Sequence, residues 1–119
     1  MTKARQHTGL TGEQIACDFL QEQGYSIIER NHRSRLGEID IVAKYREYLV
    51  FCEVKTRRGS NGMHPSLSVT AKKIDKLRQL GEHYLSRKHL MHLQPRFDVI
   101  AVQLAVRTPP NIDHFINAF

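Results

Sequence analysis

The segment at residues 37–57 constrains the fold of this chain more than any other stretch. It reads GEIDIVAKYREYLVFCEVKTR, with two apolar runs at residues 39–43 and 49–54 on either side of a polar turn. Runs rich in Ile, Val and Phe around a short turn are typical of two strands joined in a hairpin. Both faces of this hairpin carry apolar residues, so we expect it to be central in a sheet and covered on both sides.

The expected register of the hairpin brings two acidic side chains together. A short loop that pairs Lys44 with Leu49 places Asp40 directly opposite Glu53. Opposed side chains share a face, with Cβ atoms roughly 4.5–5.5 Å apart, and Lys55 points the same way. Like charges in such positions destabilise the ladder, whereas a divalent cation such as Mg²⁺ binds carboxylate oxygens. The pattern therefore indicates a metal site beside a lysine; the alternative is an edge hairpin whose charges lie in solvent.

These residues also resemble a known motif. Asp40, followed after a hairpin by Glu53-Val54-Lys55, is similar to the PD-(D/E)xK motif of restriction endonucleases and archaeal Holliday-junction resolvases. Over residues 9–119 the chain resembles the YraN-like family of bacterial proteins in that superfamily. This resemblance rests on five segments: Gly12-Glu13, Gly37-Glu38-Ile39-Asp40, Phe51-Cys52-Glu53-Val54-Lys55-Thr56-Arg57, Arg96-Phe97-Asp98-Val99 and Asn117-Ala118-Phe119.

The resemblance implies both a fold and an activity. The implied fold is a restriction-endonuclease-like α/β three-layer sandwich, in which helices flank a mixed central sheet. The implied activity is that of a metal-dependent endonuclease or nucleic-acid processing enzyme, which cleaves phosphodiester bonds and selects structure rather than sequence. The alternative is a non-catalytic module on the same fold that binds nucleic acid or a partner protein. Resolvases are dimers, which leaves a homodimer open.

The resemblance also implies roles for particular residues. Asp40 and Glu53, joined by Glu13, would bind Mg²⁺ or Mn²⁺, and Lys55 would stabilise charge on the phosphate. Glu38 would support the metal ligands. Glu13 has a second explanation, since an acidic residue in the first turn of a helix also complements the helix dipole.

Composition limits the class of protein. The chain has 119 residues with 40% hydrophobic content, which suits one globular domain with its own core. We expect a flexible arm over residues 1–8 and a single nuclease-like domain over residues 9–119. No apolar stretch is long enough to span a membrane, and the N-terminus lacks the apolar core of a signal peptide. These features predict a cytoplasmic protein.

The net charge of +6 favours a polyanionic partner. We expect nucleic acid, DNA rather than RNA; the alternative is that the charge serves solubility. Basic residues gather before the hairpin, after it, and in a later helix. The candidates for nucleic-acid binding are Arg30, Arg33, Arg35, Arg57, Arg58, Lys72, Lys73 and Lys76.

The remaining elements follow from periodicity and from turn residues. We expect a helix from Thr11 to about Gly24, a strand at 25–29, a basic connection at 30–35 and a loop at 58–66. A second helix follows Thr70, and strands follow at 97–106 and 112–116. The two cysteines are expected to be buried, and the histidines show no metal-ligand spacing. Asp98 either supports the site or is a buried hydrogen-bond acceptor, and we favour the latter.

Overall fold

The computed structural model describes the backbone of residues 3–59 and 70–118, and the side chains of this range from residue 11 onward. The loop predicted at 58–66 therefore lies largely outside the described residues. No helix in the described ranges is both long enough and apolar enough to cross a membrane.

The elements follow the predicted order of helix, three strands, helix and two strands. They are α1 (Lys3–Glu22), β1 (Ser26–Ser34), β2 (Gly37–Tyr45), β3 (Tyr48–Arg58), α2 (Ala71–Arg87), β4 (Gln94–Leu104) and β5 (Asn111–Phe115).

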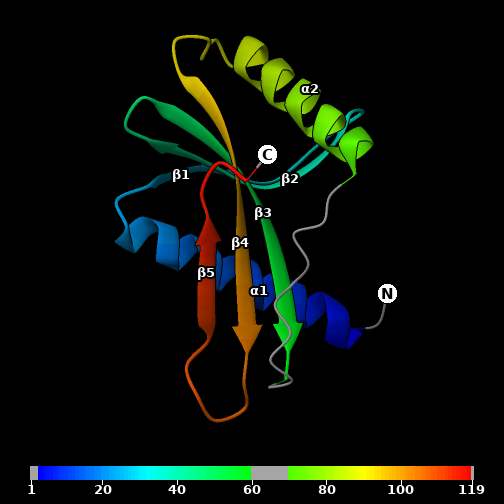
Figure 1. The fold of residues 1–119 in the computed structure, drawn as a ribbon, viewed down its shortest axis with the longest axis vertical. Coiled ribbons are helices and arrows are strands. Elements are labelled where there is room, and N and C mark those ends of the chain that lie inside the picture. Colours follow the sequence, from blue (N-terminus) through cyan, green and yellow to red (C-terminus); the bar gives the residue numbers. More distant parts are fainter. Residues whose placement is uncertain (1–2, 60–69, 119) are drawn as a thin grey trace.

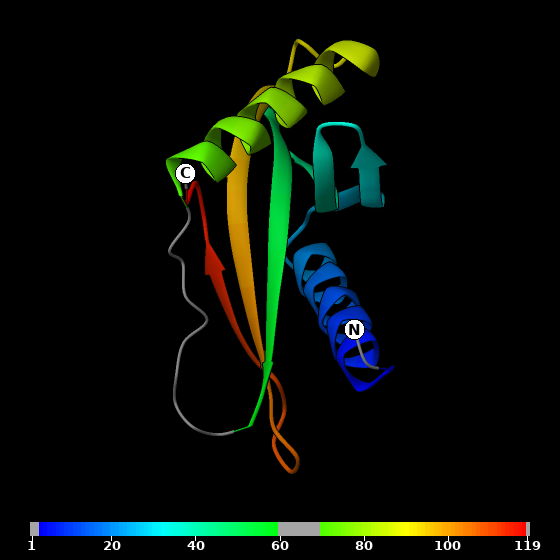
Figure 2. The ribbon, with the colours of Figure 1, turned by 90° about the vertical axis from the view of Figure 1, so that its right-hand side faces the viewer.

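One mixed sheet organises the molecule, with its strands in the order β1-β2-β3-β4-β5. Neighbouring strands are antiparallel except β3 and β4, which are parallel. Parallel neighbours need a crossover connection, and α2 lies in that connection. The two helices cover opposite faces of the sheet (Figures 1 and 2). The fold is thus the predicted three-layer α/β sandwich with a mixed central sheet.

Each face of the sheet has its own apolar core. On one face, Ala16, Cys17 and Leu20 of α1 pack against residues of β2, β3 and β4. On the other face, Leu80 and Tyr84 of α2 pack against the same three strands. The central hairpin is therefore covered on both sides, as its sequence predicted. Both cysteines are buried and unpaired, which confirms that prediction too.

Several predicted boundaries are wrong, and those of α1 and β1 differ most from the structure. Helix α1 begins at Lys3 rather than at Thr11, so most of the stretch predicted as an arm is helical. Lys, Ala, Arg and Gln are good helix formers, and a formed helix extends into such residues at little cost. Strand β1 continues to Ser34 through the stretch predicted as a basic connection. Backbone pairing such as Arg30↔Ile41 extends this edge strand regardless of its charged side chains.

Asp98 is a buried hydrogen-bond acceptor, as predicted. It is 0% exposed and accepts hydrogen bonds from the guanidinium of Arg96 at 2.8 and 3.0 Å. The backbone N–H of Asn117 donates to Asp98 at 2.9 Å, and His114 Nε2 lies 2.7 Å from the same carboxylate. Arg96 also donates to the Tyr25 hydroxyl at 2.6 Å. Although burial alone would raise the pKa of Asp98, these partners hold it below its usual value.

The contact between α1 and β3 depends on a glycine. Gly12 is buried, and a Cβ atom placed on it would overlap the Thr56 side chain, lying only 2.8 Å from Cγ2. The helix backbone can therefore approach the strand this closely only because residue 12 has no side chain. The neighbouring Glu13 is carried toward the sheet by the same contact.

We predict that Gly12→Ala destabilises the protein, although alanine is the better helix former. In an open helix the exchange would stabilise by about 1 kcal/mol. Here the overlap with Thr56 forces α1 away from β3, and such overpacking costs about 1–3 kcal/mol. Thermal and urea denaturation would measure the loss. The control is Gln21→Ala at an exposed position of the same helix; equal stability changes in the two variants would contradict the close approach.

Candidate functional site where the sheet forks

The sheet forks between β2 and β3. The pairing Lys44↔Leu49 confirms the predicted register, but the ladder ends at Ile41↔Cys52, one pair short of Asp40 and Glu53. Beyond that point β2 pairs with β1 alone, down to Gly37. Asp40 and Glu53 are therefore not a ladder pair as predicted. The backbone N–H of Val54 donates instead to Asp40 Oδ2, at 2.7 Å.

The fork also changes the face of the sheet to which side chains at the start of β2 point. Strand alternation would place Ile39 on the same face as Ile41, but the two residues belong to different cores. Ile41 packs under α1, whereas Ile39 packs with Leu80 and Tyr84 of α2. Strict alternation fails here because this end of β2 no longer follows the plane of β3. The result is an open edge of β3 beside Asp40.

Three carboxylates converge on this open edge. Glu13 comes from α1 on one face, Glu53 comes from β3 on the side of α2, and Asp40 lies between them. The Oε2 atoms of both glutamates are buried and have no hydrogen-bond partner among the described residues. Buried oxygens of this kind are costly unless something binds them.

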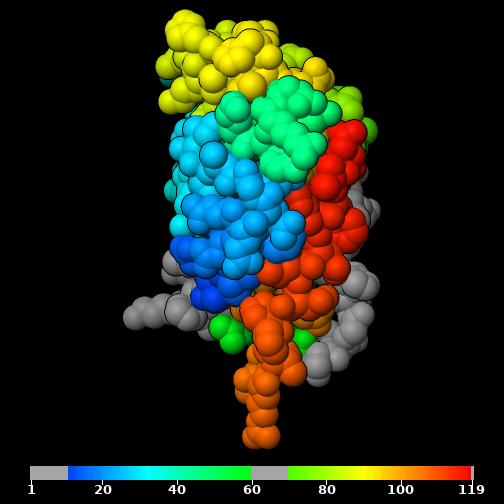
Figure 3. All heavy atoms as spheres, turned by 90° about the vertical axis from the view of Figure 1, so that its left-hand side faces the viewer, coloured from blue at the N-terminus to red at the C-terminus, as the bar shows by residue number. Residues whose placement is uncertain are grey.

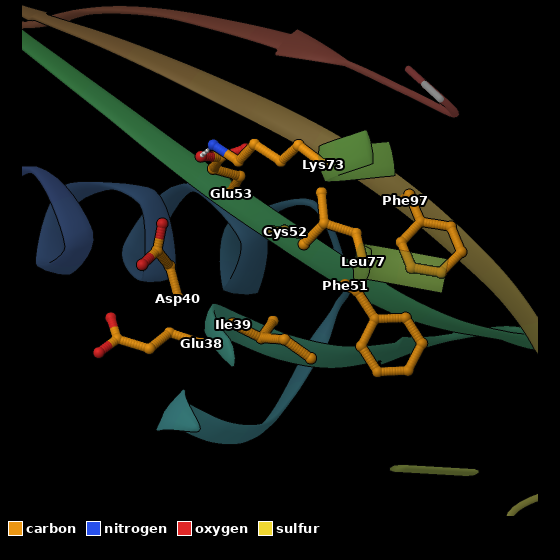
Figure 4. Close-up of a pocket in the computed structure, with 9 residues that line it drawn as sticks. All are labelled: Glu38, Ile39, Asp40, Phe51, Cys52, Glu53, Lys73, Leu77 and Phe97. Atoms are coloured by element: carbon orange, nitrogen blue, oxygen red, sulfur yellow. Dashed lines mark hydrogen bonds and ion pairs between the residues drawn. The ribbon is translucent and has the colours of Figure 1, made fainter. Parts of the chain in front are cut away.

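The acidity of Asp40 reflects this crowding. Burial first, and then the charges of Glu13, Glu53 and Glu38, raise its pKa from 3.8 to about 6, although the hydrogen bond from Val54 lowers it. Figure 4 shows Asp40 and Glu38 on β2, with the Glu38 carboxylate directed away from Glu53. Glu38 thus contributes charge from the periphery rather than from the centre of the site.

A lysine from α2 enters the site. Lys73 Nζ lies 2.8 Å from Glu53 Oε1 (Figure 4). The start of the helix places this residue, because the Thr70 side chain caps α2 and accepts a hydrogen bond from the Lys73 backbone N–H at 3.2 Å. The sequence placed Lys73 among the nucleic-acid contacts and missed this pairing. The available signal was a lysine in a first helical turn, where the helix dipole disfavours it.

A cavity of about 290 Å³ adjoins the carboxylates. Glu38, Asp40 and Glu53 form its acidic side, and Lys73 reaches into it. Apolar side chains, which sequence reasoning did not connect with the site, form the remaining wall: Ile39, Phe51, Cys52, Leu77 and Phe97. The cavity therefore has an acidic wall facing an apolar one.

The chemistry of these donors fits a hard divalent cation. Such ions take carboxylate oxygens as ligands, and two buried carboxylate oxygens here lack any partner in the described chain. Within that part of the chain, however, no three His, Cys, Asp or Glu side chains are already grouped closely enough to hold a metal. The Lys73 ammonium instead pairs with Glu53. A cation at this site would require the carboxylates to draw together and Lys73 to release Glu53.

Lys55 lies on the same strand as Glu53. It is partly buried, and strand alternation directs it to the same side of β3. In contrast to Lys73, it makes no ion pair with any described residue.

The other basic candidates come from several elements and make separate contacts. Arg30 donates to Gln14, Arg33 pairs with Glu38 at 3.4 Å, and Arg57 donates to the carbonyl of Thr56. Three further candidates are exposed on α2 or at the end of β3: Lys72, Lys76 and Arg58. Lys73, by contrast, pairs with Glu53 at the centre of the fork.

The fold and site together define a class: a three-layer α/β protein with acidic residues gathered where its mixed sheet forks. Comparison with known proteins gives the family. Residues 12–102 match the model described as the uncharacterised protein family UPF0102, and the chain belongs to this family. UPF0102 is the YraN-like family, so the match confirms the family predicted from the sequence.

Individual relatives extend the match over the whole chain. The chain is 43% identical over 119 residues to a UPF0102 protein of Syntrophotalea carbinolica, covering 100% of this chain and 96% of the relative. It is 47% identical over 118 residues to one from Trichlorobacter lovleyi, covering 98% and 93%. A relative from Caldanaerobacter subterraneus is 38% identical over 122 residues, with both chains fully covered.

We predict that Asp40→Asn stabilises the metal-free protein at pH 8 but not near pH 4. Because the folded-state pKa of Asp40 is raised from 3.8 to about 6, wild-type stability falls as pH rises through this window. Asparagine has no charge to bury and can still accept the Val54 hydrogen bond. The expected gain at pH 8 is on the order of 2–3 kcal/mol, since one pKa unit corresponds to about 1.36 kcal/mol.

Urea denaturation with a chelator at several pH values would measure this gain. Glu38→Gln removes the same charge from an exposed side chain of the same strand and serves as the control. A gain for Asp40→Asn that is equally large near pH 4 would show that burial of the charge is not its cause.

Proposed function

We propose that this protein is a metal-dependent endonuclease that hydrolyses phosphodiester bonds at the fork of its sheet. The observation that carries the proposal is the pair of buried, unpartnered Oε2 atoms of Glu13 and Glu53 on either side of Asp40. Perturbed acidic groups beside a cavity are typical of functional sites. The sequence resemblance to PD-(D/E)xK nucleases supports the same activity.

The residues divide into two roles. Asp40, Glu53 and Glu13 would hold Mg²⁺ or Mn²⁺, which supplies an activated water and neutralises charge on the phosphate. Lys55 would place its ammonium beside a non-bridging phosphate oxygen as negative charge develops there. In the reaction, a water oxygen bonds to phosphorus and the bond from phosphorus to one sugar oxygen breaks. One water proton is lost to solvent, and the leaving oxygen gains a proton.

A second candidate is a module that binds nucleic acid without cleaving it. The ion pair between Lys73 and Glu53 favours this alternative, because it neutralises the Glu53 charge through Oε1 without a metal. The described residues also hold no preassembled metal cluster. The alternative leaves the unpartnered Oε2 atoms without a role, which is why we prefer the nuclease.

Lys73→Met should tighten the binding of Mn²⁺. The Lys73 ammonium occupies Glu53 Oε1 at 2.8 Å, so a metal that uses this oxygen must first displace it. Half of the Lys73 side chain is exposed, and such pairs contribute about 1 kcal/mol or less. The expected gain is therefore at most about fivefold in Kd, measured by calorimetric titration.

The control for this titration is Lys72→Met, which removes the charge of the exposed neighbouring lysine. Asp40→Asn and Glu53→Gln should weaken binding strongly. If Mn²⁺ binds all four variants as it binds the wild type, the metal does not lie at the fork.

Lys55→Ala should abolish most cleavage while leaving metal binding intact. Lys55 carries a charge to the site but is not a metal ligand, and the loss of one electrostatic stabiliser costs about 10²-fold or more in rate. Single-turnover cleavage of linear, nicked, flapped and four-way DNA with Mg²⁺ or Mn²⁺ would measure the rate. Lys44→Ala removes an exposed lysine of β2 as the control, and Glu53→Gln gives the inactive baseline. Cleavage by Lys55→Ala at the wild-type rate would remove Lys55 from the mechanism.

A further inference from the structure

A second, basic groove lies between the tip of the β1–β2 hairpin and the C-terminal half of α2. Figure 2 shows this hairpin beneath that end of the helix. The groove has a volume of about 700 Å³ and shares no lining residue with the cavity at the fork. Basic side chains line it from both elements: His32, Arg33 and Arg35 from the hairpin, and His83, Arg87 and Lys88 from the helix side.

The acidic groups near the groove are already occupied. Glu29 accepts a hydrogen bond from the Tyr84 hydroxyl at 2.9 Å, and its other oxygen lies 2.8 Å from His32 Nδ1. The hydrogen bond with His32 is the main reason that the pKa of Glu29 is lowered. Glu38 pairs with Arg33 at 3.4 Å, with both side chains largely exposed. Within the described part of the chain, these pairs leave Arg35 and Arg87 without a carboxylate partner.

Two arginines of the groove, Arg35 and Arg87, have no ion pair among the described residues. Lys88 Nζ lies over the Tyr84 ring, 5.8 Å from its centroid. The helix dipole accounts for basic residues at the end of α2. It does not account for Arg35, which a separate hairpin brings to the same groove. Folding thus places like charges from two elements together, and a polyanion would relieve their repulsion.

The distance between the groove and the fork indicates which polyanion would fit the groove. Lys73 at the fork and His83 in the groove lie on the same helix. Ten residues at a rise of 1.5 Å separate them by about 15 Å. Phosphates of a duplex strand advance about 3.4 Å along the axis per nucleotide. For a duplex that lies along α2, the offset therefore corresponds to about four to five base pairs.

We propose that this groove binds the phosphate backbone of a DNA duplex about four to five base pairs from the phosphate at the fork. The inference rests on the proposed nuclease function for that second position, whereas binding in the groove itself needs no metal. A duplex holds its phosphates at a fixed spacing, and a flexible single strand does not. The groove would therefore select a duplex segment beside the cleaved bond.

DNA binding measured in the presence of a chelator, and so without metal, tests the groove separately from catalysis. Arg35→Gln, Arg87→Gln and the double variant would be titrated with a fluorescent duplex between about 50 and 200 mM salt. Each single change should reduce the slope of log affinity against log salt by about 1, and the double change by about 2. Arg107→Gln is the matched control, because it lies in the exposed loop between β4 and β5 (Figures 1 and 3). That loop projects from the end of the molecule opposite α2.

The outcomes separate the two proposals. The proposed DNA contact in the groove would be rejected if Arg35→Gln and Arg87→Gln kept the wild-type salt slope. It would also be rejected if Arg107→Gln reduced the slope equally. A loss seen with single-stranded DNA but not with the duplex would overturn it as well. Loss of duplex binding in a protein that never cleaves DNA would support the groove and reject the nuclease.

If the wild type cleaves DNA, the position of the cut tests the spacing. On long duplexes the double variant should show a raised KM with an unchanged kcat. That difference should vanish when the cut lies fewer than about four base pairs from the duplex end, because the strand then stops short of the groove. A difference that persists on such short arms would overturn the proposed spacing.

Discussion

The site depends on one hydrogen bond, from the backbone N–H of Val54 to the Asp40 carboxylate. Where β2 leaves β3, their ladder ends, and β3 loses its partner on that side while it stays paired with β4. A buried N–H left without an acceptor would cost about 1–3 kcal/mol, and the Asp40 side chain takes the place of the missing strand. The bond holds this carboxylate at the level of the sheet, where groups from both helical layers can approach it.

Two aspartates of the same sheet show why this arrangement points to function. Asp98 is fully buried, but Arg96, His114 and Asn117 surround its oxygens and hold its pKa down. Asp40 is less buried, yet its pKa is raised because one backbone hydrogen bond does not offset burial and three neighbouring carboxylates. The charge of Asp98 is compensated within the fold, whereas that of Asp40 is not.

The sequence predicted the framework well because local rules govern it. The apolar runs gave the hairpin and its register, and Thr70 gave the start of α2. The same rules were less reliable at the edges. The residues before Thr11 carry no local signal that distinguishes a helix from a flexible arm. The second half of β1 likewise carries none that distinguishes a strand from a loop. The covering of both faces of the hairpin followed from its composition and is confirmed.

The sequence by itself determined the order of the elements, the three-layer class and which acidic residues are candidates for a functional site. Only the tertiary structure decided how those residues meet. Strand periodicity placed Asp40 opposite Glu53, but the fork replaced that pair with a bond to Val54. The approach of Lys73 and the basic groove likewise depend on how α2 lies across the sheet. Periodicity acts between neighbours in the chain, whereas these contacts join residues far apart in sequence, and packing alone brings them together.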